Sequence, residues 1–163
     1  SQLTTINLIR DISFKGKTVA FFLPMSHHGE FDTFSLIKHA QEQQAKLCFP
    51  KTNLSTWEIS FFQLDDLTQT SVNAIGITEP NSDVLTEPHT IDIFITPLLA
   101  HDSRGFRIGY GKGCYDRYFT QCNHAHRKVG LTVFDQPTEF ECVEKTDAKL
   151  DVCYTPFSTY IFK

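Results

Sequence analysis

Apolar positions along the chain recur with two different spacings, which predict alternating helices and strands. Residues 3–12 place leucine or isoleucine at every third position, which suits a short amphipathic helix. Residues 17–23 are β-branched and aromatic and precede a proline, so they predict a buried strand. A second helix is expected over residues 34–44, where Asp32 or Thr33 can cap its first turn.

The rest of the chain continues the alternation. Further strands are expected at residues 46–50, where Pro50 ends the strand, 57–64, 91–96 and 128–134, with one or two more after Asp151, and a helix at 115–122. Residues 65–90 are polar and predict an excursion over the surface. This order predicts an α/β fold: a single three-layer domain over residues 1–163, with a largely parallel central sheet and flanking helices. Ligands in such sheets bind beyond the carboxyl ends of strands, so the loops after Leu23 and Thr96 are the places to search.

Composition narrows the functional classes. The chain has 163 residues, of which 40% are hydrophobic and 21% charged, so it can bury a core. Its net charge of −4 argues against general nucleic-acid binding. No apolar run approaches the roughly 20 residues of a membrane span, and no signal peptide is visible at the start. Five cysteines without a Cys-x-x-Cys pair indicate a reducing compartment, so a cytoplasmic protein is expected.

A glycine-rich segment is the strongest candidate for chemistry. Four of the eight glycines lie between residues 105 and 113, just before a predicted helix. Glycines let backbone N–H groups converge on phosphate oxygens, and a helix N-terminus favours the same anion. Arg107 and Lys112 can add positive charge, and Asp116 could hold Mg²⁺. The spacing matches neither common nucleotide-binding glycine motif, and a turn that merely connects strand to helix stays open as an alternative.

This segment and several others resemble those of the 5-formyltetrahydrofolate cyclo-ligase family, also called 5,10-methenyltetrahydrofolate synthetase. The similarity spans about residues 18–155. The matching segments are residues 29–33, 49–51, 76–80, 91–97, 101–117, 128–130 and 147–151. The resemblance implies cyclisation of 5-formyltetrahydrofolate to 5,10-methenyltetrahydrofolate, dependent on ATP and Mg²⁺. It further implies that the formyl oxygen takes the γ-phosphoryl group, N10 closes the ring, and ADP and phosphate are released.

The resemblance also implies roles for individual residues. ATP and the reacting formyl group would contact Arg107, Ile108, Gly109, Tyr110, Gly111, Lys112, Gly113, Cys114 and Tyr115, with Lys112 and Arg107 as the catalytic cations. The folate would contact Glu30, Met25, Tyr110, Gly111 and Cys114. Asp116 and Asp147 would hold Mg²⁺. From charge and position alone, Glu30 is better explained as a capping or surface acid near the start of the following helix.

The sequence departs from the family pattern in three ways. The family usually opens with a basic helix that contacts ATP, whereas only Arg10, Lys15 and Lys17 precede the first predicted strand here, so that helix is expected to be short or missing. Cys114 stands where an aromatic residue is common, and a thiol cannot stack on a ring as an aromatic does. Thr146 stands where many members have histidine.

Other functions stay open beside this one. Cys114 could be a nucleophile activated by a helix N-terminus, and His27 and His28 could be metal ligands, although no third ligand has a recognisable spacing. The fold class also suits a sugar-phosphate isomerase or CoA-transferase-like enzyme, and a non-catalytic nucleotide- or folate-binding module. The expected partners are ATP and a reduced folate, with no nucleic acid and no membrane, bound by a monomer.

Overall fold

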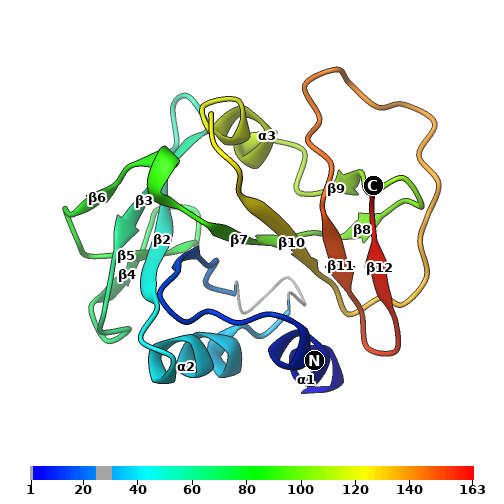
Figure 1. Ribbon diagram of the computed structural model, residues 1–163. Helices are drawn as coiled ribbons and strands as arrows, with labels where there is room; N and C mark the ends of the chain where they lie inside the picture. The colour runs from blue at the N-terminus through cyan, green and yellow to red at the C-terminus, as the bar shows by residue number, and fades with distance from the viewer. Residues whose placement is uncertain (1, 25–30) are drawn as a thin grey trace.

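In the computed structural model, which describes residues 2–24 and 31–163, eight strands form one sheet in the order β12-β11-β10-β7-β1-β2-β3-β6 (Figure 1). These strands are β1 (Thr18–Ala20), β2 (Lys46–Asn53), β3 (Glu58–Gln63), β6 (Leu85–Thr86), β7 (Ile93–Pro97), β10 (Arg127–Leu131), β11 (Val152–Tyr154) and β12 (Thr159–Ile161). Two small hairpins lie outside it, β4 (Thr70–Val72) with β5 (Thr78–Pro80), and β8 (Ala100–His101) with β9 (Arg107–Ile108). The helices are α1 (Gln2–Asp11), α2 (Phe34–Glu42), α3 (Cys114–Phe119) and the 3-10 turn η1 (Pro88–Thr90).

The centre of the sheet is parallel. Strands β11, β10, β7, β1 and β2 pair parallel to one another, and antiparallel pairings add β12 at one edge and β3 and β6 at the other. The predicted α/β fold with a largely parallel sheet is therefore confirmed. Its parallel strands end along one edge, where the segment after β7 leads to the glycine-rich loop.

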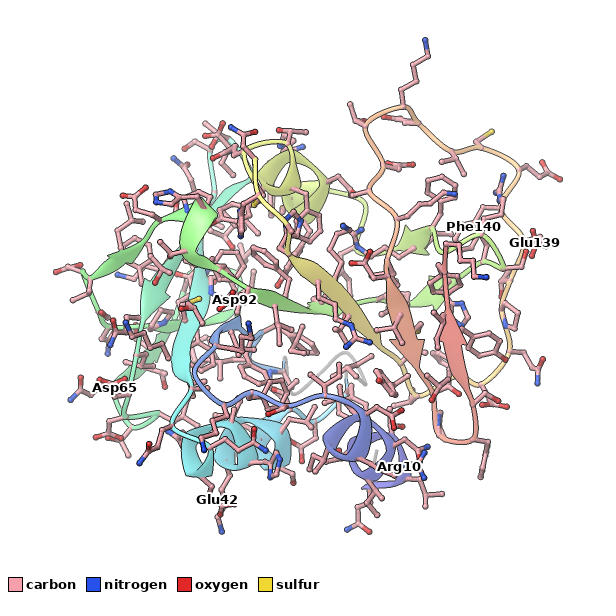
Figure 2. The ribbon with its side chains drawn as sticks, in the orientation of Figure 1. Arg10, Glu42, Asp65, Asp92, Glu139 and Phe140 are labelled. Atoms are coloured by element: carbon pink, nitrogen blue, oxygen red, sulfur yellow. The ribbon has the colours of Figure 1, made fainter. Side chains whose placement is uncertain are left out.

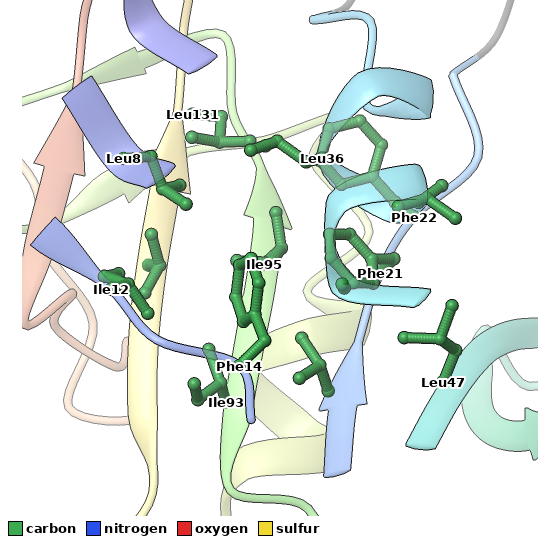
Figure 3. Close-up of a cluster of buried hydrophobic side chains, with 14 of the residues drawn as sticks. Leu8, Ile12, Phe14, Phe21, Phe22, Leu36, Leu47, Ile93, Ile95 and Leu131 are labelled. Carbon is green, nitrogen blue, oxygen red and sulfur yellow. The ribbon is translucent and has the colours of Figure 1, made fainter. Parts of the chain in front are cut away.

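The two faces of the sheet carry separate cores, because successive side chains of a strand point to opposite faces. On one face, α1 and α2 cover a cluster that includes Leu8, Phe21 and Ile95 (Figure 3). On the other face, α3 covers a cluster of aromatic side chains, with Phe61 and Tyr118 ring centroids 4.9 Å apart. Figure 1 shows α1 and α2 below the sheet and α3 above it, which gives the three layers predicted.

Helix α1 forms as predicted, but it buries a different face. Thr4, Thr5 and Leu8 are buried, whereas Leu3 and Ile6 are about half exposed. A spacing of three falls short of the roughly 3.6-residue helical turn, so an i, i+3 stripe winds away from the core. Its basic residue Arg10 pairs with neighbouring Asp11 and lies on the opposite side of the sheet from α3 (Figure 2). This helix therefore does not bring Arg10 to the glycine-rich loop.

Strand β2 corrects the prediction that Pro50 ends it. The strand runs on to Asn53, and Pro50 pairs with Phe61 of β3. The parallel partner β1 reaches only as far as Cys48, so beyond that point β2 has a neighbouring strand on one side. A proline is tolerated there because no second ladder needs its missing N–H.

Two further predictions need adjustment in the first half of the chain. The polar stretch 65–90 is not only a surface excursion, because it contributes β6 to the main sheet. At the start of α2, Asp32 accepts a hydrogen bond from the N–H of Phe34 at 3.0 Å, whereas the Thr33 hydroxyl donates to the Phe22 carbonyl instead of capping the helix.

Asp92 aligns the two strands that lead toward the site. Its carboxylate accepts a hydrogen bond from the N–H of Thr18 at 2.9 Å, and its own N–H donates to the Thr18 carbonyl at 2.9 Å (Figure 2). Lys17 adds a partly exposed ion pair to the same carboxylate at 3.8 Å. The starts of β1 and β7 are thereby fixed side by side, which brings their carboxyl ends to the same edge.

Candidate functional site

The hairpin of β8 and β9 follows β7 and is organised by a buried carboxylate. Asp102 is fully buried and accepts hydrogen bonds from the N–H groups of Arg104 and Phe106, both at 2.9 Å. The Arg104 side chain approaches the same carboxylate to 2.7 Å. Gly105 turns the chain with φ of +92°, and a Cβ there would lie 2.7 Å from the Phe162 ring. These contacts fix the hairpin that carries Arg107 into the site.

The chain from β10 to β11 passes over this hairpin and secures it. Glu139 accepts a hydrogen bond from the N–H of Ser103 at 3.2 Å, and the Phe140 carbonyl accepts one from Arg104 at 3.0 Å (Figure 2). The Thr138 N–H also donates to the His101 carbonyl at 2.8 Å. The base of the candidate site is therefore tied to a segment more than 30 residues later in the sequence.

The glycine-rich loop, residues 109–113, joins β9 to α3 and is open to approach. Gly111 and Gly113 have φ values of +77° and +60°, a region that side-chain-bearing residues rarely adopt. Within residues 2–24 and 31–163, the N–H groups of Gly109, Gly111, Lys112 and Gly113 donate no hydrogen bond. Apart from the adjacent residues of the loop, no described residue has an atom within 4 Å of a Cβ placed on Gly109 or Gly111. The loop thus presents free donors, as a phosphate cradle requires.

Trp57, in the turn between β2 and β3, packs against this loop. The Lys112 ammonium lies 4.6 Å from the centroid of the Trp57 ring, a cation–π distance. Arg117 of α3 donates to the Trp57 carbonyl at 2.7 Å. Neither the glycine spacing nor any local pattern pointed to Trp57, which lies 55 residues before Lys112 in the printed sequence.

Arg107 and Asp116 form an ion pair at the back of the loop. The guanidinium donates to Asp116 Oδ1 at 3.0 Å and to the Ala148 carbonyl at 2.9 Å, and the Ala148 N–H donates to the same Oδ1 at 3.0 Å. The Arg107 side chain is only 5% exposed. The structure therefore places this predicted catalytic cation against a carboxylate and a backbone carbonyl rather than on the open side of the loop.

Asp116 and Asp147, the two residues expected to hold Mg²⁺, come close through Ala148. Asp116 binds the N–H of Ala148, the residue that follows Asp147. Asp147 uses Oδ2 to accept the N–H of Glu144 at 2.8 Å. Each carboxylate keeps one oxygen that accepts no hydrogen bond from the described residues. Mg²⁺ commonly binds one or two carboxylates together with phosphate oxygens and water, so this donor pair fits it.

No group of three or more His, Cys, Asp or Glu side chains among residues 2–24 and 31–163 is arranged to hold a metal ion. A site built by protein ligands alone, as structural zinc sites are, is therefore not formed by these residues. The candidate metal ligands His27 and His28 lie outside the described residues.

Cys114 begins α3 without the features of an activated nucleophile. Burial raises the pKa of its thiol, and the nearby Arg117 and Lys112 charges only partly oppose that effect. Helix α3 spans six residues, Cys114–Phe119, instead of the eight predicted, so its dipole is weak. This environment favours the protonated thiol, which argues against Cys114 as a nucleophile.

The other predicted contact residues fall into two groups. Tyr115 packs into the aromatic core beneath α3, with its ring 6.2 Å from that of Phe61. Ile108, at the end of β9, and Tyr110, within the loop, are exposed. Met25 and Glu30, predicted to contact the folate, lie outside the described residues.

The family model of the 5-formyltetrahydrofolate cyclo-ligase family matches residues 7–156, nearly the whole chain. The chain belongs to this family.

Named relatives of the family agree with the match. A 5-formyltetrahydrofolate cyclo-ligase from Escherichia coli K12 is 33% identical over 143 residues, covering 85% of this chain and 78% of the relative. One from Mycoplasma pneumoniae is 29% identical over 136 residues, covering 83% and 71%. The resemblance inferred from the motifs is thereby confirmed.

Solved structures of the family share the fold. The NMR structure of Aquifex aeolicus 5,10-methenyltetrahydrofolate synthetase matches with a TM-score of 0.80 and 28% identity, covering 99% of this chain and 80% of that one. A 5,10-methenyltetrahydrofolate synthetase from Mycoplasma pneumoniae matches with a TM-score of 0.73 and 25% identity, covering 94% and 82%. The cyclo-ligase family is a family of ligases, so the prediction of a ligase is confirmed at the level of the family.

None of the helices that the structure describes is long and apolar enough to cross a membrane.

Proposed function

We propose that the chain converts 5-formyltetrahydrofolate to 5,10-methenyltetrahydrofolate with consumption of ATP, in the presence of Mg²⁺, and releases ADP and phosphate. The observation that carries this proposal is the glycine-rich loop of a cyclo-ligase family member, with free N–H donors at Gly109, Gly111, Lys112 and Gly113. A triphosphate needs several convergent donors and a cation, and this loop supplies both.

The reaction proposed is transfer of the γ-phosphoryl group to the formyl oxygen, followed by attack of N10 on the activated carbon and loss of phosphate. Such transfers depend mainly on positioning and on neutralising charge, so no protein nucleophile is needed. Lys112 is the catalytic cation in this proposal because it is exposed beside the free donors. Arg107 supports the site indirectly, because its hydrogen bonds hold Asp116 and the backbone of Ala148 in place.

Asp116 and Asp147 would hold the Mg²⁺ ion, each through the oxygen that the described residues leave without a hydrogen bond. When bound there, the ion would neutralise charge on the phosphates. The Arg107 contact to Asp116 Oδ1 keeps that carboxylate in place beside the loop whether or not the ion is bound.

The folate would lie next to the triphosphate, contacting Tyr110, Gly111 and Cys114, with Glu30 and Met25 completing its site. Tyr110 is 39% exposed and can present its ring to a ligand. A carboxylate such as Glu30 can accept two N–H bonds from the aminopyrimidinone edge of a pterin. We propose further that the chain acts as a monomer in the cytoplasm.

The deciding experiment follows formation of the methenyl product by its absorbance, with ATP, Mg²⁺ and 5-formyltetrahydrofolate supplied together and each omitted in turn. We expect product only when all three are present, with one ADP formed for each product molecule. Ligand binding by calorimetry without product would indicate a binding module, and turnover of a sugar phosphate without ATP would indicate an isomerase. Either result would overturn the proposal.

A further inference from the structure

Trp57 has a backbone conformation that bulky side chains rarely adopt. Its φ is +57°, in the left-handed region. The turn around it is fixed by hydrogen bonds: the Trp57 N–H donates to the Asn53 carbonyl at 2.7 Å, and the Asn53 side chain accepts the N–H groups of Ser55 and Thr56. Glycine adopts this φ more readily than tryptophan, so the presence of tryptophan indicates that its side chain has a functional role.

The side chain faces the glycine-rich loop. The indole ring lies under the Lys112 ammonium, 4.6 Å from centroid to nitrogen, and the Trp57 carbonyl accepts a hydrogen bond from Arg117. Arg117 in turn lies 3.2 Å from the point where Gly113 would carry a Cβ, so its guanidinium lies along the loop. Trp57 therefore contacts two exposed cations, Lys112 of the loop and Arg117 of α3.

We propose that Trp57 is a positioning residue that holds Lys112 beside the free donors of the loop, ready for the terminal phosphates of ATP; this inference rests on the proposed function. A lysine side chain has many rotamers, and only some place the ammonium next to the loop. A cation–π contact at an exposed site favours the bound rotamers by about two- to fivefold. That is enough to pre-organise the lysine, whose ammonium can keep one side on the ring while its N–H donors reach a phosphate.

The first test separates the ring from the backbone. Trp57→Gly removes the indole and suits the left-handed φ, and Trp57→Phe keeps an aromatic face. With Trp57→Gly we expect the KM for ATP to rise about two- to fivefold while the KM for the folate does not change measurably. Trp57→Phe should recover most of the loss. Equal changes in both KM values, or no recovery by phenylalanine, would overturn the inference.

The second test asks whether Trp57 acts through Lys112. Calorimetry would measure the affinity for Mg²⁺ with a non-hydrolysable ATP analogue in the wild type, Trp57→Gly, Lys112→Met and the double variant. If the indole only positions the lysine, Trp57→Gly should cost no further affinity once Lys112 is methionine. An additional loss in the double variant, as large as in the wild type, would show that the ring contacts the nucleotide directly and would overturn the inference.

The third test uses the fact that Trp57 is the only tryptophan in the chain, so that its fluorescence reports this contact alone. The ATP analogue with Mg²⁺ should change the emission of the wild type, because a phosphate bound to the ammonium alters the charge facing the ring, and should change that of Lys112→Met far less. Unchanged emission in a protein that binds the analogue and turns over would refute the positioning role and leave the proposed function standing. Failure to bind nucleotide at all would refute both.

Discussion

The Arg107 guanidinium lies 3.0 Å from the Asp116 carboxylate, and both residues also bind the backbone of Ala148. Three segments, β9, α3 and the chain before β11, therefore meet at one ion pair, and the last of them lies more than 30 residues from the other two. The pair is largely buried, with 5% of the arginine and 21% of the aspartate side chain exposed. A charge left alone in such a place is costly, so the pair holds the loop and the carboxylates in a fixed relation.

Asp116→Asn should weaken both folding and metal use. The variant keeps the shape but removes the charge facing Arg107, and we expect a loss of about 1–3 kcal/mol in the free energy of unfolding, measured by urea titration. The Mg²⁺ concentration for half-maximal turnover should rise several-fold. Asp147→Asn is the matched control, because Asp147 pairs with no cation among the described residues: it should raise the Mg²⁺ requirement with little loss of stability. An unchanged Mg²⁺ titration in both variants would remove them from the metal site.

Lys112→Ala should slow the chemical step more than it weakens folate binding. Charge on the transferring phosphoryl group grows in the transition state, and losing one such contact commonly costs about 10²-fold in kcat. Steady-state kinetics would measure kcat and both KM values. Lys38→Ala, on the exposed side of α2, is the control for loss of a lysine and should behave as the wild type. A rise in the folate KM as large as the fall in kcat would contradict this role for Lys112.

Sequence reasoning located the glycine-rich loop and Lys112 because both belong to one short, unusual segment. It did not find Trp57 or Ala148, since each reaches the site only through the tertiary fold: the Arg117–Trp57 hydrogen bond spans 60 residues and the Arg107–Ala148 bond 41. For the same reason Arg107 was assigned to the phosphates, whereas the structure pairs it with Asp116. Local pattern identifies charged residues but not their partners.

The secondary structure could be predicted where a hydrophobic run determines it, as in β7. The prediction was wrong where pairing with a neighbouring strand determines whether residues join the sheet. Pro50 is the clearest example, because whether proline ends a strand depends on how far β1 extends beside it. The short strand β6 is another, since only its pairing with Phe61 and Phe62 makes Leu85–Thr86 part of the sheet.

Gly111→Ala should impair nucleotide binding more than Gly109→Ala. Both positions have open space around a Cβ, but only Gly111 has a left-handed φ, so an added Cβ there strains the backbone by about 1–2 kcal/mol and turns the loop donors away from a phosphate. We expect the KM for ATP to rise about tenfold for Gly111→Ala and far less for Gly109→Ala. Similar KM values in the two variants would show that the loop tolerates a change of backbone shape.

Cys114 variants test both the nucleophile alternative and the folate contact. Because burial raises the pKa of this thiol, Cys114→Ser should keep turnover within a few-fold, and iodoacetamide should label exposed Cys142 before Cys114 at neutral pH, as peptide mass spectrometry would show. Cys114→Tyr restores the aromatic residue common in the family and should lower the KM for the folate about two- to tenfold. Loss of all turnover in Cys114→Ser would revive the nucleophile hypothesis.

His126 should make the protein less stable in mild acid. Its ring lies half-buried behind α3, stacked on Phe119 at 5.8 Å, and its Nε2 has no hydrogen-bond partner among the described residues. Burial lowers the pKa of His126, with Lys128 and His124 acting in the same direction, while Asp151 and a hydrogen bond to the His124 carbonyl oppose it. The unfolded chain therefore takes up a proton near its ordinary pKa of 6.5 before the folded protein does.

The stability contributed by neutral His126 is accordingly full above that pKa and is lost as the pH falls through the folded value. Urea unfolding between about pH 8 and about pH 5 should show a declining free energy of unfolding in the wild type and a shallower decline in His126→Phe, whose ring can keep the stack on Phe119 without a proton to accept. His89→Asn, at an exposed histidine in η1, should decline as steeply as the wild type. If His126→Phe declines equally steeply, the acid sensitivity arises elsewhere.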